Sequence, residues 1–264
     1  MSCRKLILLG EITVERGTKI MTYGVHLTTK INGKTLKKGT GIKAVEPEDY
    51  TAAQIKAIKA KGYIVLAYLS VGTLEKERSW FERFEKYKLK RLGDWPNEFY
   101  VDVRKTNWRC FLVDRAKSLK AKGYNGFWCD NIDVYSEYKS AEMFAAIKAV
   151  LKQIKAIGGY VMINGGSEWV DDALDKKVKV KNYIDGYTQE EVFSRITSYK
   201  GKGKFGKQHD EDSLYYQSMI KRAIKNHVDG FCLEYTRDKK LKDQIKAWCK
   251  KNGASYYISG DVNL

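Results

Sequence analysis

Residues 123–135 of this 264-residue chain read GYNGFWCDNIDVY. An apolar run bounded by glycines is typical of a strand buried on both faces, as in a parallel sheet. The run ends abruptly in Asp130, Asn131 and Asp133. Because α/β proteins bind their ligands beyond the carboxyl ends of their strands, this stretch predicts a parallel strand with a functional site at its end.

The same order of elements recurs along the chain. A capping-box sequence at 51–54 predicts the start of a helix, Gly62 predicts its end, and an apolar strand follows over 63–70. We count eight strands, near residues 21–27, 41–45, 63–70, 126–130, 160–164, 184–190, 230–235 and 256–259. Eight alternating units predict an α/β fold of the (β/α)8 TIM-barrel class. A doubly wound open sheet is the alternative, disfavoured because no glycine-rich phosphate loop follows a strand.

The even spread of apolar residues predicts a single barrel domain over 21–264, preceded by an N-terminal arm over 1–20. The longest interruption, 71–105, follows the third strand and therefore belongs on the active face of a barrel. We expect it to hold an amphipathic helix near its middle and an extended segment over 95–103. The charged, glycine-containing segment 197–212 is a second candidate lid.

The composition is that of a globular protein, with 43% apolar and 31% charged residues. No apolar run approaches the roughly 18 residues of a membrane-spanning helix. The N-terminus resembles a signal peptide, but its apolar part is short and Glu11 follows at once, so we predict no export signal and leave localisation open.

The formal net charge is +17, which suggests an acidic partner such as nucleic acid or an anionic wall polymer. The excess is mainly lysine on predicted helix surfaces, without an arginine-rich or aromatic-interleaved tract, so nucleic-acid binding is not expected. The five cysteines are scattered without a C-x-x-C pair, which argues against a zinc site or a disulfide framework.

Polar residues follow most of the predicted strands. They are Tyr68 and Ser70; Asp130, Asn131 and Asp133; Asn164; Gln189 and Glu190; Glu234 and Tyr235; and Ser259. This set is rich in carboxylates and amides and has no histidine. His26, His209 and His227 are predicted to be surface or packing residues. Without a histidine cluster or a G-x-S-x-G sequence, metallohydrolase and serine-hydrolase chemistry are disfavoured.

Two carboxylates facing each other across a cleft are the minimum equipment for glycoside cleavage. One protonates the leaving oxygen, while the other attacks the anomeric carbon or activates water. Asp130 and Glu190 fit these roles by position, and Glu234 is a rival for the second role because it also follows an apolar strand. Spacing along the sequence does not choose between Glu190 and Glu234.

Several stretches together resemble glycoside hydrolase family 114, whose type activity is endo-α-1,4-polygalactosaminidase. They are AYLSVG at 67–72, WPNE at 95–98, VDVR at 101–104, GYNGFWCDNIDVY at 123–135, INGG at 163–166 and DGYTQE at 185–190. The resemblance implies a TIM-barrel hydrolase that acts inside galactosamine-containing polysaccharides with retention, without metal or organic cofactor. It places the nucleophile on Asp130 and the acid/base on Glu190, with Glu191 a less favoured alignment.

The resemblance also implies that Asp133 binds an amino or hydroxyl group of the sugar. The other expected substrate contacts are Tyr68, Asn131, Tyr135, Asn164 and Glu234, with Trp95, Tyr135 and Trp169 as candidate stacking aromatics. The chain departs from the family at Glu46, where an aspartate is common. The charge of +17 would suit an acetylated or anionic polymer better than cationic galactosamine. A barrel that binds carbohydrate without cleaving it is the alternative function.

Overall fold

The computed structural model describes residues 21–264, so the predicted arm over 1–20 lies outside the described residues. Eight strands form one sheet in which all neighbouring pairs are parallel. In sheet order they are β1 (Thr22–His26), β2 (Gly41–Val45), β3 (Tyr63–Ser70), β7 (Gly126–Asp130), β8 (Tyr160–Asn164), β9 (Gly186–Glu190), β12 (Asp229–Tyr235) and β13 (Ser255–Ser259). Each of these strands matches one predicted from the sequence.

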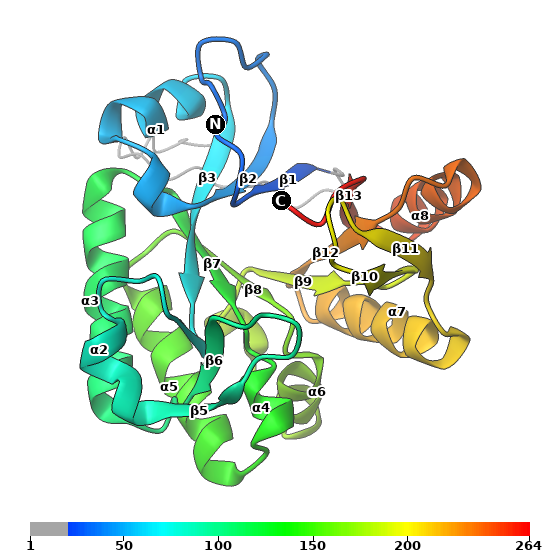
Figure 1. The fold of residues 1–264 in the computed structure, drawn as a ribbon. Coiled ribbons are helices and arrows are strands. Elements are labelled where there is room, and N and C mark those ends of the chain that lie inside the picture. The colour runs from blue at the N-terminus through cyan, green and yellow to red at the C-terminus, as the bar shows by residue number, and fades with distance from the viewer. Residues whose placement is uncertain (1–20) are drawn as a thin grey trace, which may run out of the picture.

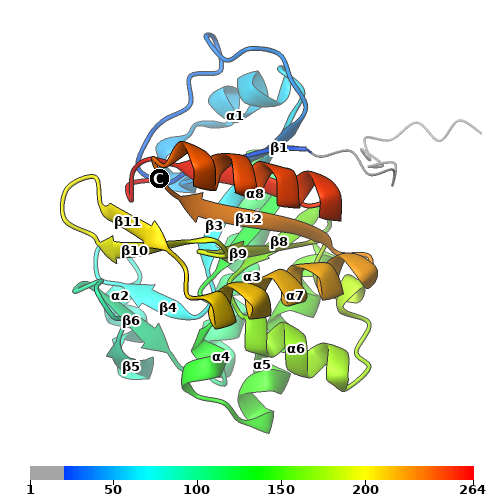
Figure 2. The ribbon, with the colours of Figure 1, turned by 90° about the vertical axis from the view of Figure 1, so that its right-hand side faces the viewer.

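Helices pack around the outside of this sheet (Figures 1 and 2). They are α1 (Ala52–Lys59), α3 (Thr106–Lys122), α4 (Val134–Glu137), α5 (Ala141–Ala156), α6 (Ser167–Asp175), α7 (Asp210–Lys225) and α8 (Lys239–Asn252). The predicted capping box begins α1, since Thr51 and Gln54 cap each other's backbone N–H groups. Within residues 21–264, no helix is long and apolar enough to cross a membrane.

The end strands β1 and β13 lie side by side and nearly close the sheet into a barrel. The Met21 N–H donates to the Ser255 hydroxyl over 3.1 Å, and the Leu27 N–H donates to the carbonyl of Leu264 over 2.8 Å. The predicted (β/α)8 TIM-barrel class is therefore confirmed. The connection from β1 to β2 is a loop, whereas helices occupy the later crossovers.

Alternation along each strand divides the apolar residues between two cores. The interior of the barrel is filled by side chains such as Tyr23, Trp128, Met162 and Phe231. A larger core between the sheet and the helices takes the neighbouring positions, including Cys129. The Trp128 indole N–H donates to the Tyr23 hydroxyl over 2.9 Å, so these two buried polar groups satisfy each other.

Two insertions stand at the carboxyl ends of the strands. The first follows β3 and holds a sheet in the order β4 (Thr73–Glu75), β6 (Glu98–Val101), β5 (Lys88–Arg91), with α2 (Phe81–Phe84) and the 3₁₀ turns η2 (Glu85–Tyr87) between. The second is the hairpin β10 (Ser194–Ser198) and β11 (Lys204–Lys207), where a lid loop is predicted. The short 3₁₀ helices η1 (Pro47–Asp49) and η3 (Val180–Asn182) complete the elements.

Candidate active site

Register and alternation bring three strand-end side chains to the mouth of the barrel. Trp128 and Met162 fill the barrel interior and pair across β7 and β8. Asp130 and Asn164 lie two residues further along these strands and therefore face the same side. Thr188 bonds Tyr23 inside the barrel, so Glu190, two residues later, also points into the mouth.

Asn164 joins the two candidate catalytic carboxylates. Its Nδ2 donates to Asp130 Oδ1 over 2.9 Å and to Glu190 Oε1 over 2.5 Å. Because both oxygens contact one nitrogen, the gap between them cannot exceed the sum of these two distances. The Asn164 Oδ1 has no donor among the described residues, so the amide is oriented to satisfy the carboxylates.

Each carboxylate has a further donor of its own. The Asn131 N–H donates to Asp130 Oδ1 over 2.9 Å, and the Tyr235 hydroxyl donates to Glu190 Oε2 over 2.6 Å. Tyr235 belongs to the strand-end residues of the sequence but was not among the predicted contacts. Alternation along β12 could have identified it, because Phe231, Leu233 and Tyr235 all point into the barrel interior.

Glu234 lies on the other face of β12 and does not line the cleft. Its side chain is 0% exposed and accepts hydrogen bonds from the backbone N–H groups of Phe193 and Ser194 and from the Ser194 hydroxyl. Burial raises the pKa of Glu234 to about 8. This residue fastens the β10–β11 hairpin to β12, so the structure favours Glu190 over Glu234 as the partner of Asp130.

Asp130 and Glu190 are partly exposed at the mouth of the barrel, although protein encloses their carboxyls. Burial raises the pKa of both groups, and the negative charge of Glu190 raises the pKa of Asp130 further. No lysine or arginine among residues 21–264 forms an ion pair with either. The pair therefore retains a proton at pH values where isolated carboxyls would be ionised.

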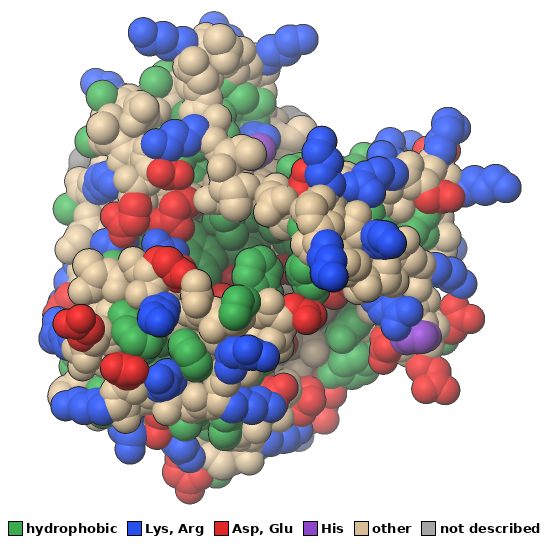
Figure 3. Space-filling view, in the orientation of Figure 1, with side chains coloured by type: hydrophobic (Ala, Val, Ile, Leu, Met, Phe, Trp, Pro, Cys, Tyr) green, Lys and Arg blue, Asp and Glu red, His purple; other side chains and the backbone are tan. Residues whose placement is uncertain are grey.

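Figure 3 shows a hollow in the centre of this face, with hydrophobic side chains inside it and acidic ones at its edges. Most lysine and arginine side chains in this view lie farther out. On this face the cationic side chains therefore surround the hollow rather than line it.

The turn after Asp130 is held by the first insertion. Asn131 adopts a left-handed backbone conformation, with φ of 62°. Its Nδ2 donates to Thr73 Oγ1 over 2.8 Å and to Glu98 Oε1 over 3.1 Å. Burial raises the pKa of Glu98 to about 7. Gly72 is required here because a Cβ atom would lie 1.8 Å from the carbonyl oxygen of Asn131.

Asp133 holds the turn after β8. Its Oδ1 accepts a hydrogen bond from the Gly166 N–H over 2.8 Å, and a Cβ atom on Gly165 would collide with its Oδ2. Its enclosure by protein raises the pKa of Asp133 to about 6, although the side chain remains exposed to solvent. Asp133 thus supports the turn of Asn164 and keeps a solvent-exposed surface.

A family model for glycoside hydrolase family GH114 matches residues 17–260. The chain belongs to this family. It is therefore a glycoside hydrolase, with carbohydrate as its substrate. An uncharacterized protein of Deinococcus radiodurans is 28% identical to this hydrolase over 260 residues, covering 85% of this chain and 84% of the relative. A second uncharacterized relative, from Methanocaldococcus jannaschii, is 25% identical over 238 residues and covers 81% of this chain and 66% of its own.

Solved structures share the fold of the hydrolase. The glycoside hydrolase domain of PelA from Pseudomonas aeruginosa superposes with a TM-score of 0.76 at 16% identity, covering 93% of this chain and 97% of that one. Ega3 of Aspergillus fumigatus, in complex with galactosamine, superposes with a TM-score of 0.73 at 16% identity, covering 97% of each chain. At this identity the superpositions establish a common fold.

The aromatic side chains predicted to contact the sugar differ in how much of each ring is exposed to solvent. Trp169 is 0% exposed and Tyr135 is 3% exposed, so neither ring is available to stack on a sugar. The Tyr135 hydroxyl instead donates to Asp172 over 2.5 Å. Trp95 is 49% exposed. Tyr68 is half-buried at the mouth of the barrel, where its ring contacts Trp128.

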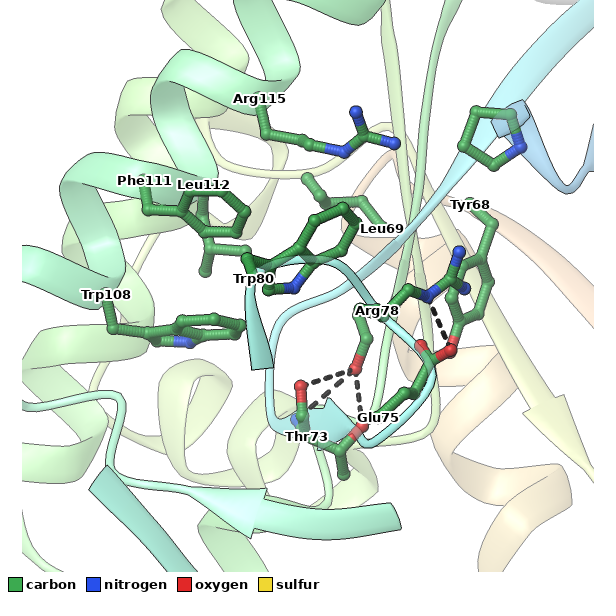
Figure 4. Close-up of a pocket in the computed structure, with 12 residues that line it drawn as sticks. Tyr68, Leu69, Thr73, Glu75, Arg78, Trp80, Trp108, Phe111, Leu112 and Arg115 are labelled. Carbon is green, nitrogen blue, oxygen red and sulfur yellow. Dashed lines mark hydrogen bonds and ion pairs between the residues drawn. The ribbon is translucent and has the colours of Figure 1, made fainter. Parts of the chain in front are cut away.

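Arg78 binds Glu46, the residue where the sequence departs from the expected aspartate. Its guanidinium donates to both carboxylate oxygens of Glu46 at 2.9 Å and to Glu75 at 2.6 Å, and it lies over the Tyr68 ring. Figure 4 shows Arg78 between Tyr68 and Glu75, beside a small cavity of about 20 Å³ lined by Trp80. Glu46 is thus committed to an ion pair. Among the described residues, His, Cys, Asp and Glu form no group of three that could hold a metal ion.

Proposed function

We propose that this glycoside hydrolase cleaves galactosamine-containing, α-1,4-linked polysaccharide as an endo-acting, retaining enzyme, with Asp130 as nucleophile and Glu190 as acid/base. The observation that carries the proposal is the Asn164 amide, whose Nδ2 lies 2.9 Å from Asp130 and 2.5 Å from Glu190. Retaining enzymes place their carboxyl groups about 5–5.5 Å apart, and inverting enzymes about 6.5–9.5 Å. The shared nitrogen keeps the nearest oxygens closer together than the inverting range.

The proposed reaction has two displacement steps. In the first, Asp130 attacks the anomeric carbon, the bond to the leaving sugar oxygen breaks, and Glu190 gives that oxygen a proton. In the second, Glu190 removes a proton from water, the water oxygen attacks the anomeric carbon, and the bond to Asp130 breaks. The Asn131 N–H and the Asn164 amide orient Asp130, while Tyr235 orients Glu190. The first step requires one proton on the pair, because Asp130 attacks as a carboxylate and Glu190 donates a proton.

The choice of a galactosamine polymer is supported by two observations. The fold is similar to that of Ega3 in complex with galactosamine. Acidic side chains also lie at the edges of the hollow in Figure 3, and Asp133 is an exposed carboxylate beside the turn of Asn164; such groups would attract an ammonium group. Peripheral lysines oppose this attraction weakly, because charges beyond about 8 Å are largely screened at physiological salt. Tyr68, Asn131, Asp133 and Asn164 are the proposed sugar contacts.

The test is the release of reducing ends from a polysaccharide panel that includes galactosamine, N-acetylgalactosamine and anionic wall polymers. We expect internal cleavage of the galactosamine polymer by the wild type and none by Asp130→Asn. Proton NMR of the first product reports its anomeric configuration, and we expect retention. Cleavage of an acetylated or anionic polymer alone would contradict the substrate. An inverted first product would contradict the role of Asp130 as nucleophile.

A further inference from the structure

Each insertion forms a hydrogen bond with the residue that follows one proposed catalytic carboxylate. Asn131 follows Asp130 and is bonded by Thr73 and Glu98 of the first insertion. Glu191 follows Glu190, and its carboxylate accepts a hydrogen bond from the Ile196 N–H in β10. Asn131 and Glu191 share a left-handed backbone conformation, with φ of 62° and 56°. Each insertion is therefore hydrogen-bonded to the residue next to one member of the pair.

The tips of the two insertions meet. Trp95, between β5 and β6, lies with its ring centroid 5.7 Å from that of Tyr199, between β10 and β11, at an interplanar angle of 66°. Trp95 is 49% and Tyr199 38% exposed, and among the described residues the other large exposed hydrophobic side chains are Leu214 and Tyr215. Two partly exposed aromatic rings from distant parts of the chain thus touch each other.

Each insertion contacts a residue beside the catalytic pair, and Glu98 of the first insertion bonds Asn131, which follows Asp130. Burial raises the pKa of Tyr199, and the charges of Glu191 and Glu190 raise it further. In the same hairpin, Phe205 stacks on Tyr235, the residue that donates to Glu190, with ring centroids 6.2 Å apart. Figures 1 and 2 show both insertions projecting from the same end of the barrel.

We propose that Trp95 and Tyr199 form an aromatic clasp over the sugar chain bound at Asp130 and Glu190, and that this clasp determines the preference for long chains. The proposal rests on the proposed function. A contact between two exposed rings is weak enough to open. While the Trp95–Tyr199 contact is closed, an interior segment of a polymer cannot enter the space beneath it. The clasp must therefore separate to admit a long chain and then closes its rings on the sugars, while a short oligosaccharide enters from the side.

The test compares kcat and KM on the polymer and on a galactosamine trisaccharide for Trp95→Ala, Tyr199→Ala and the double variant. Aromatic contacts of this kind correspond to about 3- to 10-fold in affinity, so we expect each variant to raise KM for the polymer by that factor. We expect kcat on the trisaccharide to stay within about twofold. Trp95→Phe and Tyr199→Phe should restore most of the polymer KM, because each retains a ring.

The double variant should raise KM little more than either single variant, because losing one ring already opens the clasp. Leu214→Ala is the matched control, since it removes an exposed apolar side chain from α7, and it should change neither substrate's KM. An unchanged polymer KM in Trp95→Ala and Tyr199→Ala would overturn the clasp. Equal losses on polymer and trisaccharide would also overturn it, because they would indicate a general defect of the site.

A covalent lock provides a second measurement. Trp95→Cys with Tyr199→Cys, on a Cys3→Ser, Cys110→Ser background, is treated with a short bismaleimide and the bridge is verified by mass spectrometry. We expect the bridged protein to lose polymer hydrolysis and to keep trisaccharide hydrolysis, with N-ethylmaleimide as the unbridged control. Undiminished polymer hydrolysis after bridging would overturn the proposal. A wild type inactive on every polymer would instead contradict the proposed function.

Discussion

The two ends of this barrel use buried carboxylates in opposite ways. At the amino end of β9, Asp185 accepts hydrogen bonds from the Val161 N–H at 3.0 Å and from Lys181 at 2.5 Å, and it pairs with Lys155. Burial opposes ionisation of Asp185, yet these partners lower its pKa. At the carboxyl end, Asp130 and Glu190 have no cationic partner among the described residues, and burial raises the pKa of both.

This difference separates stability from chemistry. A carboxylate that is held ionised by lysines contributes to folding and has no proton to exchange near neutral pH. A pair of carboxylates that retains a proton can donate and accept during a reaction. The contrast agrees with the general division of TIM barrels into a catalytic face and a stabilising face.

The largest effect is expected from removing the negative charge of Asp130 at the carboxyl end of the barrel. Asp130→Asn should lower kcat by about 10⁴-fold or more, because an amide cannot form the glycosyl intermediate. The melting temperature should stay the same or rise, because burial penalises the charge that is removed. Reducing-end assays and thermal melts measure the two effects. A fully active variant would remove Asp130 from the mechanism.

Glu190→Gln tests the proton of the pair and should lower kcat by about 10²–10⁴-fold. The wild type should show a bell-shaped pH profile. Activity falls at low pH when both carboxyls of the pair are protonated, and at high pH, above the ordinary carboxyl range, when the pair loses its one proton. The residual activity of the variant should lack the alkaline limb. A surviving alkaline limb would indicate another acid.

At the amino end, Asp185→Asn should lower the free energy of unfolding by about 2 kcal/mol, because two lysines and a buried N–H lose their charged acceptor. The folded pKa of Asp185 is lowered, so its stabilisation is complete above the unfolded value near 4 and is lost as pH falls below it. Urea unfolding at pH 7 and pH 3 should show the difference at pH 7 shrinking at pH 3. Activity per folded molecule should be unchanged.

Tyr235→Phe removes the hydroxyl that donates to Glu190 and so tests what sets the pKa of this carboxyl. The Tyr235 hydroxyl lowers the pKa of Glu190, so its removal should raise that pKa further and move the alkaline limb of the pH profile upward. Loss of one hydrogen bond to a charged group costs about 1.5–3 kcal/mol at most, so kcat/KM should fall by about 10-fold. An alkaline limb that moves downward would contradict the role given to this hydroxyl.

Lys181→Met should have the smallest effect. Its ammonium pairs with Asp185, but the Lys181 side chain is 32% exposed and Lys155 remains as a partner. Solvent screening limits such a pair to about 0–1 kcal/mol. Urea unfolding should therefore detect a loss well below that of Asp185→Asn, and kcat should not change. A loss as large as that of Asp185→Asn would mean that Lys181 alone balances the buried charge.

The sequence was sufficient to predict the strands of the barrel and the residues at their ends. A strand buried on both faces requires a local apolar run, and glycine or polar residues mark where it stops, so the eight strands could be recognised one at a time. The short strands β4 and β5 were not predicted, because in the first insertion pairing with β6 decides their conformation. The resemblance to the family rested on the same strand-end residues.

The amino-acid sequence by itself determined the fold class and a short set of candidate carboxylates, because both are properties of local patterns. Only the tertiary structure decided which carboxylates face each other. Glu190 and Glu234 have similar sequence surroundings, yet one bonds Asn164 and the other bonds the β10–β11 hairpin. Whether a strand-end side chain points into or out of the barrel depends on the register of its strand in the nearly closed sheet. That register is set by all eight strands together.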